Sequence, residues 1–163
     1  MDSSFTLSQR ATIVATFAIG ILLTLAPLPR SIGILRPDWV ALILVYWCLA
    51  IPDRIGVGSA WILGLVLDGL YGSLLGEQAL AKALLAFLTL RFTLRLRVFP
   101  RWQQSLAVAV LIALSDLVVL MVKSLAQGTT PIWSDTAPMI ANLILWPFLF
   151  TVLREVRRRA KIS

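Results

Sequence analysis

Residues Gly56–Gly76 read GVGSAWILGLVLDGLYGSLLG, an apolar run in which every fourth residue is small or acidic. Positions i and i+4 are neighbours on one face of an α-helix, so the run predicts a helix with a ridge of minimal side chains. The ridge consists of Gly56, Ala60, Gly64, Asp68, Gly72 and Gly76. Such a ridge is typical of close packing between two membrane helices. We expect the carboxylate of Asp68, in its middle, to meet a group on the second helix.

The rest of the chain is as apolar as this run. Of its 163 residues, 59% are hydrophobic and 14% are charged, against about 45–50% and about 25% in a soluble domain. The composition predicts an all-α integral membrane protein, in which residues 1–163 form a single polytopic transmembrane domain. We expect a compact bundle of about six transmembrane helices, with five spans as the alternative. The expected spans are residues 11–26, 39–51, 55–71, 74–92, 104–125 and 137–153.

Two of these spans raise questions of their own. The span 11–26 has the length of a signal peptide, but no small-x-small cleavage site follows it, so we expect a retained anchor. The span 39–51 is shorter than the roughly 20 residues that cross a bilayer upright. It must therefore be buried among neighbouring helices or lie in locally thinned lipid.

Basic residues predict the orientation of the chain. With the N-terminus in the cytoplasm, 11 of the 15 basic residues lie on the cytoplasmic side of the expected spans, and an even number of spans returns the C-terminus to that side. We expect these arginines to contact anionic lipid headgroups, with a partner protein as the alternative and no role in binding nucleic acid. They include Arg91, Arg95, Arg97 and Arg101 in a predicted cytoplasmic hairpin, and Arg154, Arg157, Arg158 and Arg159 near the C-terminus.

The carboxylates of Asp68 and Asp116 lie well inside expected spans. An ionised acid at the bilayer centre costs about 2.5–3.5 kcal/mol on insertion scales, so such groups normally face protein or a wet cavity. A rise of about 1.5 Å per residue brings both acids and Asn142 to one level in the outer half of the membrane. We predict a polar pocket open to the outside; the alternative is that the acids only lock helices together. The candidate residues are Arg36, Asp38, Asp68, Asp116, Lys123, Asn142 and Trp146, with Arg36 or Lys123 as partners of the acids.

The chain lacks the residues that several kinds of catalytic and binding site need. The chain has no histidine, and its one cysteine, Cys48, lies in an apolar span, which excludes histidine-dependent triads, CxxC pairs and internal disulfides. The acids invite comparison with intramembrane aspartyl proteases, but the GxGD signature of that group is absent. No P-loop or Rossmann glycine pattern occurs either. We therefore expect no enzymatic activity, no cofactor and no metal.

Residues 36–80, RPDWVALILVYWCLAIPDRIGVGSAWILGLVLDGLYGSLLGEQAL, resemble the bacterial rod shape-determining MreD family. The shared features are the RPD motif at 36–38, the PxRxG turn at 52–56, the GLxxD core at 64–68, and the glycine turn 72–76 that leads to Ala79-Leu80. RWQQ at 101–104 and NLILWPFLF at 142–150 fit the same family. The resemblance covers most of the chain, and the specificity comes from the order and spacing of these pieces.

The resemblance implies a non-enzymatic protein of the bacterial inner membrane. Members of the family belong to the cell elongation machinery, pair with MreC, and help to organise the lateral cell-wall synthases. Those synthases are a class B penicillin-binding protein and the RodA polymerase, with MreB as an indirect partner on the cytoplasmic side. The family is also similar in fold to the S component of energy-coupling factor transporters. A vitamin-binding membrane subunit is therefore the alternative function.

Overall fold

The computed structural model describes residues 7–27, 29, 36–128 and 137–162. The described residues form six α-helices, and none of them lies in a strand. The helices are α1 (Leu7–Leu25), α3 (Trp39–Ala50), α4 (Val57–Tyr71), α5 (Glu77–Val98), α6 (Arg101–Gln127) and α7 (Ala137–Arg159). The all-α prediction and the predicted number of helices are thus confirmed for the described residues.

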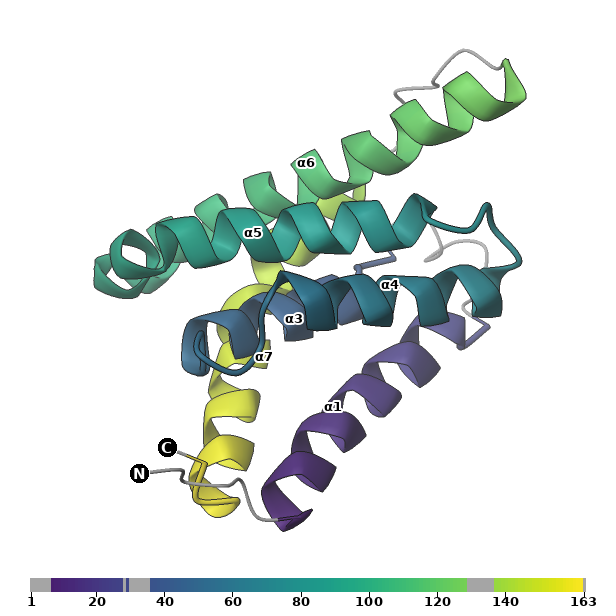
Figure 1. The fold of residues 1–163 in the computed structure, drawn as a ribbon. Helices are drawn as coiled ribbons and strands as arrows, with labels where there is room; N and C mark the ends of the chain where they lie inside the picture. Colours follow the sequence, from purple (N-terminus) through teal and green to yellow (C-terminus); the bar gives the residue numbers. More distant parts are fainter. Residues whose placement is uncertain (1–6, 28, 30–35, 129–136, 163) are drawn as a thin grey trace.

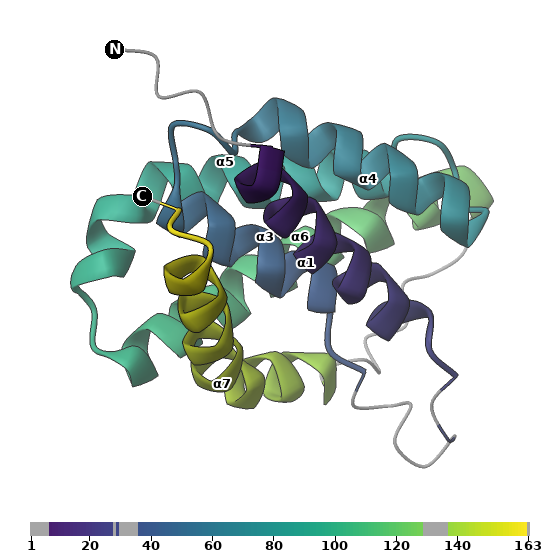
Figure 2. The same ribbon diagram turned by 90° about the horizontal axis from the view of Figure 1, so that it is seen from below.

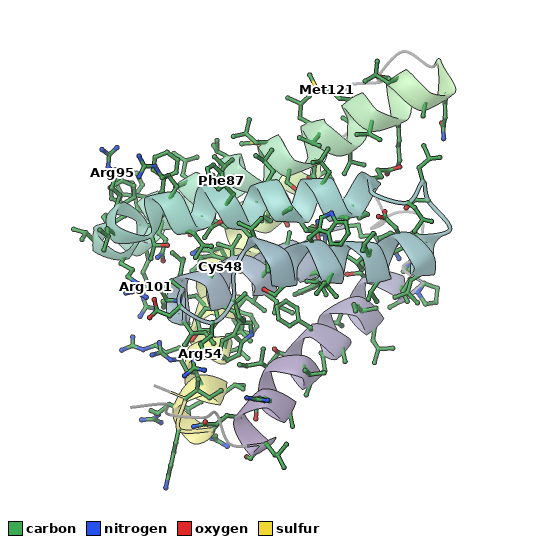
Figure 3. All side chains as sticks on the ribbon, in the orientation of Figure 1. Cys48, Arg54, Phe87, Arg95, Arg101 and Met121 are labelled. Atoms are coloured by element: carbon green, nitrogen blue, oxygen red, sulfur yellow. The ribbon has the colours of Figure 1, made fainter. Side chains whose placement is uncertain are left out.

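Consecutive helices run in alternate directions between two ends of the bundle (Figure 1). At one end α1, α4 and α6 begin while α3, α5 and α7 finish; we call it the basic end because Arg54, Arg95 and Arg101 all lie there (Figure 3). We call the other end of the bundle, where α3, α5 and α7 begin, the opposite end. The start of α1 and the finish of α7 are neighbours at the basic end (Figure 2), where the Gln9 side chain donates a hydrogen bond to the Lys161 carbonyl at 2.8 Å.

The surface of the bundle is suited to lipid. Helices α1, α6 and residues Pro138–Arg159 of α7 are long and apolar enough to cross a membrane, whereas α3 and α4 are apolar but shorter. Large apolar side chains point outward, including Leu22, Ile144 and Phe148, each more than two-thirds exposed. A soluble monomer rarely exposes so much contiguous apolar surface, so these helices indicate a transmembrane protein.

Helix α3 is the core of the bundle. Every side chain from Val40 to Leu49 is buried, and α3 packs against α1, α5, α6 and α7. A helix that is apolar on all sides is stable where protein surrounds it. With 12 residues, α3 is only about 18 Å long. Of the two alternatives for the short span, burial among neighbouring helices is therefore correct.

Helices α4 and α5 form the closest-packed pair. A Cβ atom on Gly64 would lie 2.3 Å from the Ala79 Cα atom on α5, so only glycine fits there. Ala60, one turn earlier, is also buried. The predicted continuous ridge is wrong at its ends, because α4 spans only Val57–Tyr71 and excludes Gly56, Gly72 and Gly76. Gly72 and Gly76 have φ angles of 62° and 101°, which favour glycine and reverse the chain between α4 and α5.

Two helices continue further toward the basic end than the sequence suggested. Helix α5 extends to Val98, so Arg91, Arg95 and Arg97 lie on a helix and the predicted hairpin is reduced to a turn at Phe99 and Pro100. Helix α7 likewise continues through the basic segment to Arg159. Arginine is a good helix former, and Pro100 is the first helix-breaking residue after Gly76, so charge alone does not end these helices.

Candidate functional site

Asp68 binds the backbone at the start of α5. Its carboxylate accepts hydrogen bonds from the backbone N–H of Gly76 and of Gln78, both at 2.8 Å, and from the Ser73 hydroxyl at 2.9 Å. Asp68 is 1% exposed, and its negative charge lies at the positive end of the α5 dipole. The expected pairing of Asp68 with Arg36 or Lys123 is therefore wrong, because α5 already supplies its partners.

A pocket of about 280 Å³ lies at the opposite end of the bundle. It is lined from α1, α4, α5, α6, the first turn of α7 and the residues that precede α3. Its polar lining consists of Thr24, Arg36, Asp38, Tyr71, Gln78, Lys82 and Asp116. The structure thus brings together three predicted residues, Arg36, Asp38 and Asp116, and adds Lys82, which was not predicted. We call Asp38, Lys82 and Asp116 the charge cluster.

Asp38 joins three helices through this cluster. Its carboxylate forms an ion pair with Lys82 of α5 and caps α3 by accepting the Ala41 N–H at 2.9 Å. Its own N–H donates to the Asn142 Oδ1 atom of α7 at 3.1 Å. Asn142 thus belongs to the wall of the site through the backbone of Asp38.

Lys82 was missed because it was counted among the charges on the outer side rather than within a span. It lies in the second turn of α5 and is 1% exposed, and an ammonium group buried in this way needs a carboxylate partner. The signal in the sequence was its position eight residues inside the expected span 74–92. A buried lysine within an apolar span is as informative as a buried acid.

Asp116, like Asp38, is a half-buried member of the charge cluster. It faces the Lys82 ammonium and the Asp38 carboxylate, but no hydrogen bond reaches its side chain from the described residues. Two carboxylates share one ammonium within the cluster, and the Arg36 guanidinium in the lining supplies a second positive charge. This guanidinium donates to the Ala26 carbonyl at 2.5 Å. The Asp116 carboxylate is therefore able to accept a hydrogen bond from a group in the pocket.

The other two predicted residues lie elsewhere. Lys123 is 3.3 Å from the Oε1 atom of Glu77, a buried acid in the first turn of α5 that the sequence analysis did not single out. Trp146 is fully buried and donates from Nε1 to the Gln104 Oε1 atom at 3.3 Å. Trp146 thus packs against the start of α6, away from the pocket, because α7 has already run a full turn toward the basic end after Asn142.

The eight predicted lipid-facing arginines fall into different groups. Arg97 donates from Nε to the Leu49 carbonyl at 2.9 Å, and Arg101 contacts Thr151 at 3.3 Å and the Phe150 ring at 5.8 Å. These two contact the bundle itself, and both remain exposed, so their contact with lipid headgroups stays a prediction. Arg158 and Arg159 pair with Glu155 on the outside of α7. Arg91 and Arg95 are exposed on α5, and Arg154 and Arg157 line a cavity described below.

Comparison with known proteins decides the family. The family described as rod shape-determining protein MreD matches residues 5–156. The chain belongs to the MreD family. It is also 34% identical over 162 residues to the rod shape-determining protein MreD of Haemophilus influenzae. The aligned region covers 99% of each chain. MreD membership confirms the resemblance seen in residues 36–80 and implies a role in maintaining rod cell shape.

No solved structure matches this MreD homologue. The likeness of its fold to the S component of energy-coupling factor transporters therefore stays a prediction. The MreD match includes all residues of the charge cluster and the whole α4–α5 pair. It thus covers the elements that build the candidate site.

Proposed function

We propose that this protein is a non-enzymatic component of the cell elongation complex in the bacterial inner membrane. It maintains rod shape by binding MreC, and through MreC it organises the class B penicillin-binding protein and RodA, with MreB as an indirect partner. The observation that carries this proposal is the match to the MreD family along nearly the whole chain. The positive-inside rule supports a cytoplasmic location for the basic end and for both termini.

Apart from Asp116, the acids at the opposite end are engaged within the fold, which favours a binding role over a catalytic one. General acid–base catalysis needs a titratable group that can reach a substrate. Asp68 is enclosed by the backbone of α5, Asp38 is paired with Lys82, and Glu77 lies beside Lys123. These groups hold helices together, which favours a rigid scaffold whose surface carries the function.

An apolar groove of about 460 Å³ offers a surface for the MreC contact. Helices α1 and α4 form its walls, with Phe17 on α1 and Ile62 on α4, and Leu44 of the buried α3 lies at its base. Ala18 and Ser59 also line the groove, and small side chains of this kind let a further helix approach closely in a membrane. An apolar helix of MreC fits the chemistry of this groove.

Copurification from membranes tests the proposal. Tagged wild-type protein should retain MreC, and loss of the protein should turn rods into spheres. Ile62→Trp fills the groove and should weaken MreC retention about tenfold, the equivalent of roughly 1.4 kcal/mol. The matched control is Phe87→Trp, at an exposed apolar position on α5, which should retain MreC normally. Equal retention of MreC by both variants would show that the groove does not bind MreC. Absence of MreC from the wild-type preparation would refute the scaffold function.

The vitamin-binding alternative has no specific observation in its favour. Ligand pockets are usually about 300–1,000 Å³, and the opposite-end pocket, at about 280 Å³, lies just below that range. The same preparation separates the two functions, because a transporter subunit would carry a small molecule and an ATPase module instead of MreC.

A further inference from the structure

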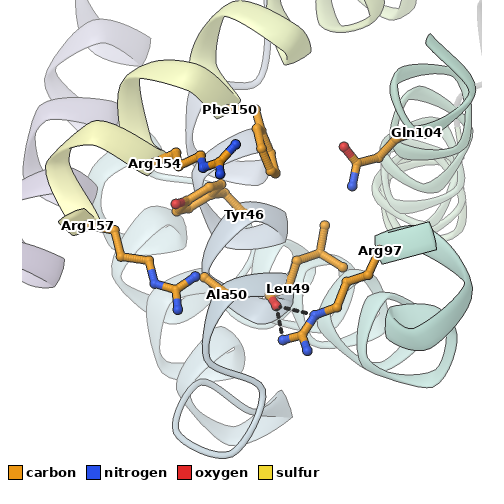
Figure 4. A pocket seen from close by; sticks show the side chains of 8 residues that line it. All are labelled: Tyr46, Leu49, Ala50, Arg97, Gln104, Phe150, Arg154 and Arg157. Carbon is orange, nitrogen blue, oxygen red and sulfur yellow. Dashed lines mark hydrogen bonds between the residues drawn. The ribbon is translucent and has the colours of Figure 1, made fainter. Parts of the chain in front are cut away.

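A second cavity, of about 330 Å³, lies at the basic end below the last turn of α3. Helix α3 stops at Ala50, whereas α5 and α7 continue past it to Val98 and Arg159. The neighbouring helices therefore enclose a space that α3 does not fill. Figure 4 shows the side chains around it, with Tyr46 and Leu49 from α3 and Arg154 and Arg157 from α7.

Three guanidinium groups line this cavity, those of Arg97, Arg154 and Arg157. Phe150, Arg154 and Arg157 follow one another at intervals of four and three residues, which places them on one face of α7. The Tyr46 hydroxyl lies beside Arg157. Arginines from two helices thus converge on one space together with a phenol.

The positive charge in this cavity is not neutralised within the described part of the chain. No carboxylate of those residues lies within ion-pair distance of Arg97, Arg154 or Arg157. Glu155, the acid nearest in sequence, instead pairs with Arg158 and Arg159 on the outer side of α7. These three guanidinium groups can therefore be neutralised by an anion that does not belong to the described residues.

Capping of α3 accounts for only part of this arrangement. The Arg97 guanidinium donates twice to the Leu49 carbonyl, which satisfies the negative end of the helix. Arg157 uses its Nε on the Ile162 carbonyl at 3.0 Å, and no hydrogen bond connects Arg154 to another described residue. Because a guanidinium has five N–H donors, most of those on Arg154 and Arg157 remain available.

We propose that this cavity binds the phosphate of an anionic phospholipid headgroup. Guanidinium groups match phosphate oxygens in geometry and charge, and they bind them through paired hydrogen bonds. The lining also includes the apolar Leu49, Ala50 and Phe150 side chains, which suit the glycerol and first acyl carbons of a lipid. Basic pockets between transmembrane helices at the cytoplasmic side are known to hold headgroups in this way.

Native mass spectrometry of the purified full-length protein in detergent tests the proposal. With added phosphatidylglycerol the wild type should retain one lipid, and with phosphatidylcholine it should retain none. Arg154→Gln should reduce phosphatidylglycerol retention about tenfold, the effect of one charge-assisted contact. Arg95→Gln is the matched control, because Arg95 is an exposed arginine at the same end that does not line the cavity.

Two further measurements distinguish a lipid phosphate from free phosphate and from diffuse attraction. Inorganic phosphate at millimolar concentration should not displace the lipid, since it lacks the acyl part; full displacement would overturn the lipid assignment. Equal losses in Arg154→Gln and Arg95→Gln would show that binding is only diffuse attraction to the basic end, and would also overturn it. Arg154 is exposed and carries no internal hydrogen bond, so its variant should fold. Tyr46→Phe gives a second measurement without changing charge, with a smaller loss expected.

Discussion

Asp68 shows that an acid buried in a membrane protein can stabilise the fold instead of forming a functional site. The first N–H groups of any helix lack partners within the helix, and in a bilayer no water replaces them. Asp68 supplies the acceptors for two of these groups on α5, and the Gly72–Gly76 turn brings them within reach. An acid that looked like part of a functional pocket is thus first a requirement of the fold.

Replacement of Asp68 should therefore destabilise the protein. Asp68→Leu leaves the N–H groups of Gly76 and Gln78 unsatisfied, which should cost about 2–4 kcal/mol at roughly 1–2 kcal/mol for each group. Asp116→Leu removes an acid that carries no hydrogen bond from the described residues and should cost less. Thermal unfolding in detergent measures both. Equal midpoints for Asp68→Leu and the wild type would contradict the capping role.

The Lys82–Asp38 ion pair makes a second prediction at this scale. Lys82→Met leaves two carboxylates without their ammonium and should destabilise the protein by about 3–5 kcal/mol, because one charge of a buried pair is removed. Lys82→Met with Asp38→Asn should recover part of the loss, since asparagine still caps α3. A double-mutant cycle on unfolding free energies measures the coupling. Additive effects of the two substitutions would show that the pair does not contribute to stability.

Two elements, α3 and the α4–α5 pair, set the architecture. Helix α3 is short because it meets protein on all sides, and the helices around it face the lipid. Helices α4 and α5 lie so close that the Ala79 backbone occupies the place of a Gly64 side chain. This close approach brings Asp68 to the start of α5 and, one turn later, Lys82 toward Asp38. The packing of one glycine thus positions both charged contacts.

Two glycines of α4 provide a matched test of this packing. Gly64→Ala should force α4 and α5 apart and cost about 1–3 kcal/mol or more, as overpacking does. Gly58→Ala has no atom within 4 Å of the new Cβ and should stabilise α4 by up to about 1 kcal/mol. Unfolding in detergent measures both variants. A neutral Gly64→Ala would mean that the two helices separate at no cost.

The whole molecule is polarised along its long axis. Arg54, Arg95 and Arg101 lie at the basic end (Figure 3), as does the cavity lined by three arginines, whereas the charge cluster and its pocket lie at the opposite end. Between them lies a belt of exposed apolar side chains. This arrangement matches a membrane with its cytoplasmic side at the basic end.

Cysteine labelling of intact cells tests this orientation. Leu75→Cys lies in the exposed α4–α5 turn at the opposite end, and Val98→Cys lies at the exposed end of α5. A membrane-impermeant maleimide should label Leu75→Cys from outside and Val98→Cys only after permeabilisation. Cys48 is fully buried, so the wild type provides an unlabelled background. The reverse pattern would invert the proposed topology.

The sequence by itself determined that this is an all-helical membrane protein of the MreD family with a basic end. Those properties depend on composition, local periodicity and the order of motifs, which a single chain displays directly. The predicted meeting of Arg36, Asp38 and Asp116 came from the helical rise and from the position of RPDW at the outer start of the second expected span. The predicted helix boundaries at the basic end were less accurate, because arginine is as compatible with a helix as with a loop.

Only the tertiary structure decided the partner of each polar group. Asp68 meets α5, Lys123 meets Glu77, and Lys82 meets Asp38. Helical periodicity gives the height and the face of a side chain, but the partner also depends on which helices are neighbours and how closely they pack. Here the space at Gly64 and the burial of α3 fix those neighbours, and both are properties of the assembled bundle.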